Sequence, residues 1–357
     1  MIVTANCDLE EVRRNPRIQV NARHLKWEPA EGEEAVLDQA RDLLDDTKNP
    51  YYGKPKILSS DGANIWRALI RDIQGMMRTD GSQHFEHFDQ PFSREVGLRG
   101  RATRQKHYFE EVQNRMAQVG AKATPLEPGG VLGLSDDGGR LLWNGEPAVL
   151  MGWSFYGFLT TERHNLKVFF DLLAKHRINF TRVWCVEQWT ALGLGQSVEG
   201  EWLWRSGLCP FRGGPSRRVG GGRKYDLSKL DGTFFRRLHE FVDRARKAGV
   251  VVQLSLFDRA GLRDLRKAGH WRDSPYNAVN NTNGFLVDIE NEYPKEFTGV
   301  EGTAIGDVHE ALVRRVLATL RGAGNVMVEI GNEFRGRMPN EAEWHHWIAG
   351  LLHEKVR

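Results

Sequence analysis

Four short apolar runs alternate with helical patterns through the C-terminal two thirds of the chain. The runs, rich in Val, Ile and Leu, cover residues 148–153, 178–184, 250–256 and 326–330. Continuous apolar character of this kind is typical of strands that are buried on both faces of a parallel sheet. Between the runs, apolar residues recur at the three- and four-residue spacing of an amphipathic helix. Alternating strands and helices predict βα units and an α/β fold.

The first 120 residues repeat this alternation with weaker signals. Strands are predicted at residues 1–7, 17–22, 56–59 and 82–88, with helical patterns in three of the intervening or following stretches. A sheet of only the four later strands would have two long apolar edges, which favour aggregation. We therefore expect the early strands to complete the sheet by closing it into a barrel.

The order of the segments predicts a circularly permuted (β/α)8 TIM barrel. Residues 1–120 would form the second half-barrel with strands five to eight, and residues 121–130 a linker rich in Pro and Gly. Residues 131–357 would supply a small β-hairpin and then the first half-barrel, so that both halves make one domain. Permutation is tolerated where the original termini lie close together and the new ones fall in an exposed loop. The alternative is an unrelated N-terminal domain beside a truncated barrel.

The charge and composition of the chain argue against nucleic acid and membranes as binding partners. The chain carries 50 Lys and Arg against 47 Asp and Glu, a net charge of +3, so we expect neither nucleic acid nor an anionic membrane as a partner. No apolar run approaches the roughly 18 residues of a membrane span. The N-terminus lacks the pattern of a signal peptide, which favours a cytoplasmic location, and three cysteines cannot make a disulfide framework.

Several stretches are similar to the clan A glycoside hydrolases, the cellulase-like (β/α)8 retaining glycosidases. Residues 325–333, NVMVEIGNE, resemble the fourth strand of that superfamily with its terminal Asn-Glu pair. Residues 140–152, 179–184 and 225–258 resemble the stretches around its first three strands, and residues 54–62 resemble its seventh strand. The resemblance implies hydrolysis of O-glycosidic bonds in a poly- or oligosaccharide, a carbohydrate substrate as partner and no cofactor.

The resemblance also implies catalytic residues. Glu333 matches the general acid/base, and Asn332 matches the residue that hydrogen-bonds the 2-hydroxyl of the sugar. A second carboxylate is required at the anomeric carbon. The usual position of this nucleophile falls on Ser60, so the neighbouring Asp61 is the first candidate and Glu86 the reserve. Asp61 is equally well explained as a turn residue or a helix cap.

Residues near the predicted strand ends are candidates for substrate binding. If the resemblance holds, Arg182 pairs with the carboxylate of the seventh strand; an ordinary ion pair at the barrel rim is the alternative. Asp258 and His24 are candidate partners for sugar hydroxyls. Aromatic rings stack on the C–H faces of pyranoses, and seven aromatic side chains follow or end predicted strands: Trp27, Trp153, Tyr156, Trp184, Trp189, Phe257 and Trp271. Glu329, inside its strand, is expected to be structural.

Two other functions compete with the glycosidase hypothesis. A metal-dependent barrel hydrolase is suggested by the ligand types of His84, Glu86, His87 and Asp89, although no zinc-binding helix motif accompanies them. A catalytically inactive carbohydrate-binding barrel is suggested by the serine at the nucleophile position. For the glycosidase itself, no metal is expected.

Overall fold

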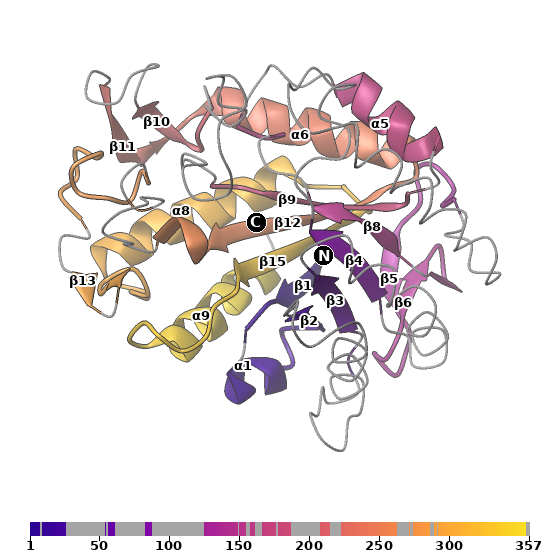
Figure 1. Ribbon diagram of the computed structural model, residues 1–357, viewed down its shortest axis with the longest axis horizontal. Helices are drawn as coiled ribbons and strands as arrows, with labels where there is room; N and C mark the ends of the chain where they lie inside the picture. The colour runs from indigo at the N-terminus through magenta and orange to yellow at the C-terminus, as the bar shows by residue number, and fades with distance from the viewer. Residues whose placement is uncertain are drawn as a thin grey trace, which may run out of the picture.

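The chain is described here from a computed structural model (Figure 1). The structure describes residues 1–7, 9–25, 54, 56–60, 83–87, 125–148, 150–154, 158–160, 166–175, 178–186, 208–214, 223–262, 271, 274–285, 289–290 and 292–354. Parallel strands and helices dominate these residues, so the predicted α/β class is confirmed.

Eight parallel strands close into a barrel. Around the barrel they are β1 (Ile2–Ala5), β2 (Val20–Leu25), β3 (Lys56–Ser60), β4 (Gln83–His87), β8 (Met151–Ser154), β9 (Phe180–Trp184), β12 (Val251–Asp258) and β15 (Val326–Asn332). Strand β1 pairs with β15, with Val3 opposite Val328, and β4 pairs with β8, with Phe85 opposite Gly152. The early strands thus lie in the same sheet as the later ones.

Helices surround part of the barrel in Figure 1. They are α1 (Glu10–Arg14), α5 (Leu166–Lys175), α6 (Gly232–Lys247), α8 (Ala304–Thr319) and α9 (Glu341–His353). Helices α5, α6 and α8 confirm the helical patterns that were predicted between the four apolar runs. The side chains of Asp231 and Thr303 cap α6 and α8 by accepting backbone N–H bonds. No helix of the described part is long and apolar enough to cross a bilayer.

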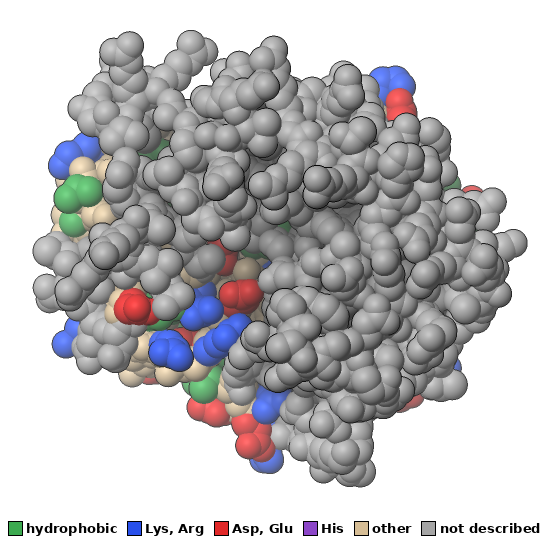
Figure 2. Space-filling model, viewed as in Figure 1, with side chains coloured by type: hydrophobic (Ala, Val, Ile, Leu, Met, Phe, Trp, Pro, Cys, Tyr) green, Lys and Arg blue, Asp and Glu red, His purple; other side chains and the backbone are tan. Residues whose placement is uncertain are grey.

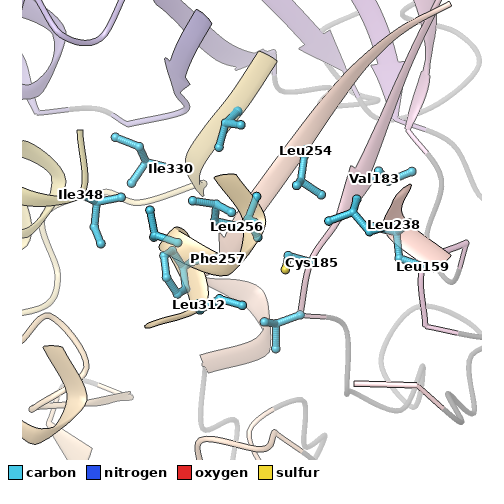
Figure 3. Packing of buried hydrophobic residues seen from close by; sticks show 14 of the residues in the cluster. Leu159, Val183, Cys185, Leu238, Leu254, Leu256, Phe257, Leu312, Ile330 and Ile348 are labelled. Atoms are coloured by element: carbon cyan, nitrogen blue, oxygen red, sulfur yellow. The ribbon is translucent and has the colours of Figure 1, made fainter. Parts of the chain in front are cut away.

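The outer face of the barrel packs against these helices. Outward side chains such as Val183, Leu254 and Ile330 share one buried cluster with Leu238 of α6 and Leu312 of α8 (Figure 3). Burying this apolar area is the main favourable contribution to folding. It also fixes the direction of the alternate residues, which must face the inside of the barrel.

A small antiparallel sheet closes one end of the barrel. Its strands are β5 (Leu132–Leu134), β6 (Leu141–Trp143) and β7 (Glu146–Pro147), which confirms the predicted hairpin. The positive φ angles of Asn144 and Gly145 suit a tight hairpin turn. Leu132, Leu141 and Trp143 cluster with residues at the beginnings of the barrel strands, namely Ile2, Val20, Phe180, Val251 and Met327. Because the hairpin covers the amino ends, an open site belongs at the carboxyl ends.

Two buried histidines lie behind the carboxyl end of β15. The His309 ring packs among aromatic side chains, and its Nδ1 accepts a hydrogen bond of 3.1 Å from Trp344 Nε1. His345 Nδ1 lies 2.7 Å from the carbonyl oxygen of Glu341. Burial lowers the pKa of His309 to about 3 and that of His345 to about 4. Both rings are therefore neutral in the folded protein near pH 7.

We expect acid to destabilise the fold through these histidines. Their pKa values are lower in the folded than in the unfolded protein, so their contribution is complete above about pH 7 and is lost as the pH falls toward the folded values. Each should lower the free energy of unfolding by about 2 kcal/mol between pH 8 and pH 5. Urea titrations at both pH values measure this. His309→Gln keeps an acceptor for Trp344 and should remove about half of the loss; an unchanged pH dependence would contradict the assignment.

Candidate active site

The chain turns sharply where β15 ends. Glu333, the next residue, has a φ of 58°, in the left-handed region that costs a non-glycine residue roughly 1–2 kcal/mol. Backbone bonds hold both sides of it: Arg259 N–H donates to the Asn332 carbonyl, and Phe334 N–H donates to the Asn6 carbonyl, each at 3.2 Å. Strained backbone of this kind concentrates at functional sites.

Packing behind the turn explains why this segment adopts that conformation. Phe334 is fully buried and stacks on Trp344, with ring centroids 5.1 Å apart. A Cβ atom at position 331 would lie 2.6 Å from the Phe334 ring, so Gly331 is required there. The turn is thus held by a glycine before it and an aromatic anchor after it.

A buried carboxylate holds the loop that follows. Glu341, at the start of α9, accepts backbone N–H bonds from Gly336, Arg337 and Met338 at 2.6, 3.1 and 3.4 Å. Burial raises the pKa of Glu341, while these three bonds oppose the increase. The residues on both sides of the Glu333 turn are therefore attached to the rigid part of the fold.

An ion pair lies inside the barrel below the site. Arg182 of β9 is 1% exposed, and its Nε donates to Glu329 Oε2 at 3.0 Å, while Nη2 bonds the same oxygen. Gln253 Nε2 donates to the other carboxylate oxygen at 2.9 Å and to Thr4 Oγ1 at 3.3 Å. Strands β9, β12, β15 and β1 thus each contribute to one polar layer. The structural role expected for Glu329 is confirmed.

This layer orients Asn332. Its Oδ1 accepts from Arg182 Nη2 at 2.7 Å and from Asn6 Nδ2 at 3.3 Å, and its Nδ2 donates to Asp258 Oδ1 at 3.0 Å. A cationic donor on one side and a carboxylate acceptor on the other leave a single orientation for the amide. The nitrogen carries a second N–H, which is available for an acceptor on a ligand.

Glu333 itself contacts a second arginine. Arg259 Nη2 lies 3.4 Å from Glu333 Oε2, and its Nη1 donates to the Tyr293 hydroxyl oxygen at 2.5 Å. The guanidinium also lies over the Tyr293 ring, 5.5 Å from its centroid. The Glu333 side chain is 24% exposed and that of Arg259 is 12% exposed. This acidic group is therefore accessible from the carboxyl end of the barrel.

The structure corrects one expectation and leaves another untested. Arg182 forms an ion pair with Glu329, because inward side chains of β9 and β15 meet across β12 at the same level. The expected pair with the carboxylate of the seventh strand involves Asp61, which lies outside the described residues. Trp184 was expected to stack on sugar. Its ring is 1% exposed and packs against the Arg182 guanidinium at 4.7 Å, so it supports that arginine instead.

Several predicted site residues fall outside this description. Asp61, Trp27, Tyr156 and Trp189 are not among the described residues. The backbones of His24, Glu86 and Trp153 lie in β2, β4 and β8, with Glu86 opposite Trp153, but their side chains are not described. Because β3 ends at Ser60, Asp61 directly follows the carboxyl end of a barrel strand.

The metal-site hypothesis is likewise untested. Among the described residues no group of three or more His, Cys, Asp or Glu could hold a metal ion. The side chains of His84 and His87, and all of Asp89, are outside that part of the chain. Metal analysis of the purified protein would decide between a metal-dependent and a metal-free site.

Arg259, Tyr293, Gln253 and Asn6 are site residues that sequence reasoning missed. Only Arg259 had a usable signal, because it directly follows Asp258 at the end of a predicted strand. Tyr293 lies in β14 (Tyr293–Pro294), which pairs with β13 (Ile289–Glu290) in a short hairpin far from any predicted barrel strand. Its approach to Arg259 depends on tertiary structure.

Comparison with known proteins gives one family match. Residues 208–356 match a domain of unknown function, DUF6298. The matched residues include β12, β15 and the Asn332–Glu333 pair. The match covers less than half of the chain. No curated protein matches the sequence.

Among solved structures, the chain resembles a protein from Bacteroides vulgatus ATCC 8482 that is described as a candidate glycoside hydrolase. The identity is 14% and the TM-score 0.40. The similarity covers 63% of this chain and 36% of the other, so the present chain spans about a third of the length of that protein.

Proposed function

We propose that this protein is a glycoside hydrolase that cleaves O-glycosidic bonds of a poly- or oligosaccharide, with Glu333 as the general acid/base. The observation that carries the proposal is the position of Glu333. It is an accessible carboxylate on strained backbone, directly after β15 and at the barrel end opposite the hairpin. Active sites of eight-stranded α/β barrels lie at the carboxyl ends of the strands. Such a carboxylate has little stabilising value at that place.

The proposed mechanism uses two carboxyl groups. Glu333 donates a proton to the glycosidic oxygen as the bond to the anomeric carbon breaks, and later removes a proton from the attacking water. Asn332 offers its second Nδ2 N–H to the 2-hydroxyl group of the sugar, in the orientation fixed by Arg182 and Asp258. Asp61, immediately after β3, is the proposed nucleophile, and Glu86 of β4 is the reserve.

We also propose that the barrel is a circularly permuted (β/α)8 fold. The closed order of eight parallel strands and the pairing of β1 with β15 support it. In that reading, β15 is the fourth strand and β3 the seventh. The proposed mechanism needs the carboxyl groups that follow these two strands, Glu333 and Asp61, on the same substrate, and a separation of about 5–5.5 Å would give retention of configuration.

The test is hydrolysis of a panel of aryl glycosides by the wild type, Glu333→Gln and Asp61→Asn. We expect measurable turnover by the wild type and loss in both variants, with the configuration of the first product read by NMR. Retention supports Asp61 as nucleophile, and inversion supports its action as a general base. Wild-type turnover that survives in Glu333→Gln would refute the assignment.

A carbohydrate-binding barrel without catalysis is the second candidate function. It is favoured by one observation: β3 ends in Ser59-Ser60, where the resemblance places the glutamate nucleophile. In that case wild type and Glu333→Gln would show the same negligible turnover, and both would bind the same sugar. Calorimetric titration with oligosaccharides distinguishes this outcome from a misfolded protein.

A further inference from the structure

The guanidinium of Arg259 has more donors than acceptors. An arginine side chain carries five N–H donors, and the contacts found here are the Tyr293 hydroxyl and the Glu333 carboxylate. Its Nε is buried and has no acceptor among the described residues. The Glu333 contact of 3.4 Å is long for a charge-assisted bond, which usually measures about 2.7–2.9 Å. The Arg259 side chain is therefore held in place, but not all of its N–H donors have an acceptor among the described residues.

Tyr293 explains how the side chain is held. Its hydroxyl accepts from Nη1, and its ring lies under the guanidinium, so Tyr293 orients the arginine without using its Nε and Nη2 donors. Tyr293 is 1% exposed and belongs to the short β13–β14 hairpin. The guanidinium therefore presents donors toward Glu333 from a fixed position rather than from a mobile surface side chain.

Further positive charge follows Glu333 along the chain. Arg335 and Arg337 lie on the next loop, Arg337 is exposed, and Glu341 anchors that loop through backbone N–H groups. In the view of Figure 2, basic side chains lie next to acidic ones within the described part of the surface. Arg259 contacts the proposed acid/base, and two further arginines lie within four residues of it along the chain, so local positive charge favours a substrate that carries negative charge.

We propose that the site is specific for a sugar bearing a carboxylate, a hexuronic acid unit, and that Arg259 is the residue that recognises this group. The inference rests on the proposed function. A planar carboxylate accepts two parallel N–H bonds from one guanidinium edge, a geometry that neutral hydroxyl groups do not match. The unused Nε and the weakly engaged Nη2 of Arg259 form such an edge.

Recognition of the uronate would also prepare Glu333 for catalysis. A substrate carboxylate bound to Arg259 would bring a like charge close to Glu333, and a like charge favours the protonated form of a carboxyl group. Glu333 then takes one proton from solvent, and the substrate carboxylate stays ionised. Binding of the correct substrate thus produces the acid form that glycosidic cleavage needs.

The test compares p-nitrophenyl hexuronides with the matching neutral hexosides, in both anomeric forms. We expect the wild type to prefer the uronide by about tenfold to a hundredfold in kcat/KM, as for a hydrogen-bonded charge pair. Arg259→Met should reduce this preference to less than about threefold, mainly through KM for the uronide, and Arg259→Lys should retain part of it. The control Arg321→Met removes the same charge after α8, on an exposed residue that precedes β15. It should keep the full preference.

Calorimetric binding separates this inference from the proposed function. Free hexuronate should bind the wild type more tightly than the matching hexose, with uptake of a proton that is seen by comparing two buffers of different ionisation enthalpy. If this Arg259-dependent binding occurs but no glycoside is hydrolysed, the glycosidase proposal fails and the uronate site stands. If neutral glycosides are hydrolysed as well as uronides and Arg259→Met changes nothing, the uronate site is refuted. Tighter binding of a sulfated monosaccharide would also refute the carboxylate assignment.

Discussion

Replacing Arg182 with methionine is expected to lower the free energy of unfolding by about 3–5 kcal/mol, because it leaves a charged group buried without its partner. The Glu329 carboxylate is fully buried, and Arg182 is the cation that bonds it inside the barrel. Gln253 would remain as a donor to one oxygen only. Urea denaturation of the wild type and the variant at pH 7 measures the difference. A change below about 1 kcal/mol would contradict the importance of this ion pair.

A double variant provides the control for this prediction. Arg182→Met together with Glu329→Leu removes both charges and fills the space with apolar groups, which is often neutral or stabilising relative to the original pair. We expect the double variant to recover most of the lost stability. Activity should not recover, because Asn332 has lost the guanidinium that fixes its amide. Recovery of both properties would show that Arg182 has no role in orienting Asn332.

Replacing Glu333 with glutamine is expected to lower kcat/KM by about 10²–10⁴ for glycosides with poor leaving groups, the range attributed to general acid catalysis. The loss should be much smaller for an aryl glycoside whose leaving group departs without a proton, such as a dinitrophenyl glycoside. Glutamine preserves the shape of the side chain and its place on the left-handed turn. Measuring the rate against the pKa of the leaving group gives the result directly. An equal loss for all leaving groups would show that Glu333 acts in another step.

Glu292 supplies a matched control. It is also a glutamate with left-handed backbone, at a φ of 73°, and it is exposed in the turn before Tyr293 rather than at the end of a barrel strand. Glu292→Gln should leave both the rate and its dependence on the leaving group unchanged. If Glu292→Gln lowers the rate as strongly as Glu333→Gln, the position at the end of β15 is not what selects the acid.

The strands were predictable because each is a short apolar run. The predictions at residues 178–184, 250–256 and 326–330 correspond to β9, β12 and β15 with ends shifted by two residues at most. The strand predicted at residues 17–22 is displaced and appears as β2, Val20–Leu25. The apolar run at residues 148–153 is also displaced and appears as β8, whereas the more polar stretches at residues 56–59 and 82–88 match β3 and β4 within one residue. Apolar character therefore located strands that are buried on both faces but did not fix their ends.

The sequence did not determine which alternate side chains of β9 point into the barrel. Whether Arg182 points into the barrel depends on which alternate residues of β9 face the helices, and Val183 faces them. A shift of one residue would turn every side chain of the strand to the other face. The partner of Arg182 was therefore predicted from resemblance alone, and only the structure shows its ion pair with Glu329.

The amino-acid sequence by itself determined that parallel strands alternate with helices and that the Asn332–Glu333 pair ends one of them, because both are properties of local pattern. Tertiary structure alone decided that β1 lies beside β15, that Arg182 is paired with Glu329, and that Arg259 reaches Glu333 from a neighbouring strand. Each of these contacts joins residues that are far apart along the chain. Their formation depends on barrel closure and on the register of neighbouring strands, which no local pattern contains.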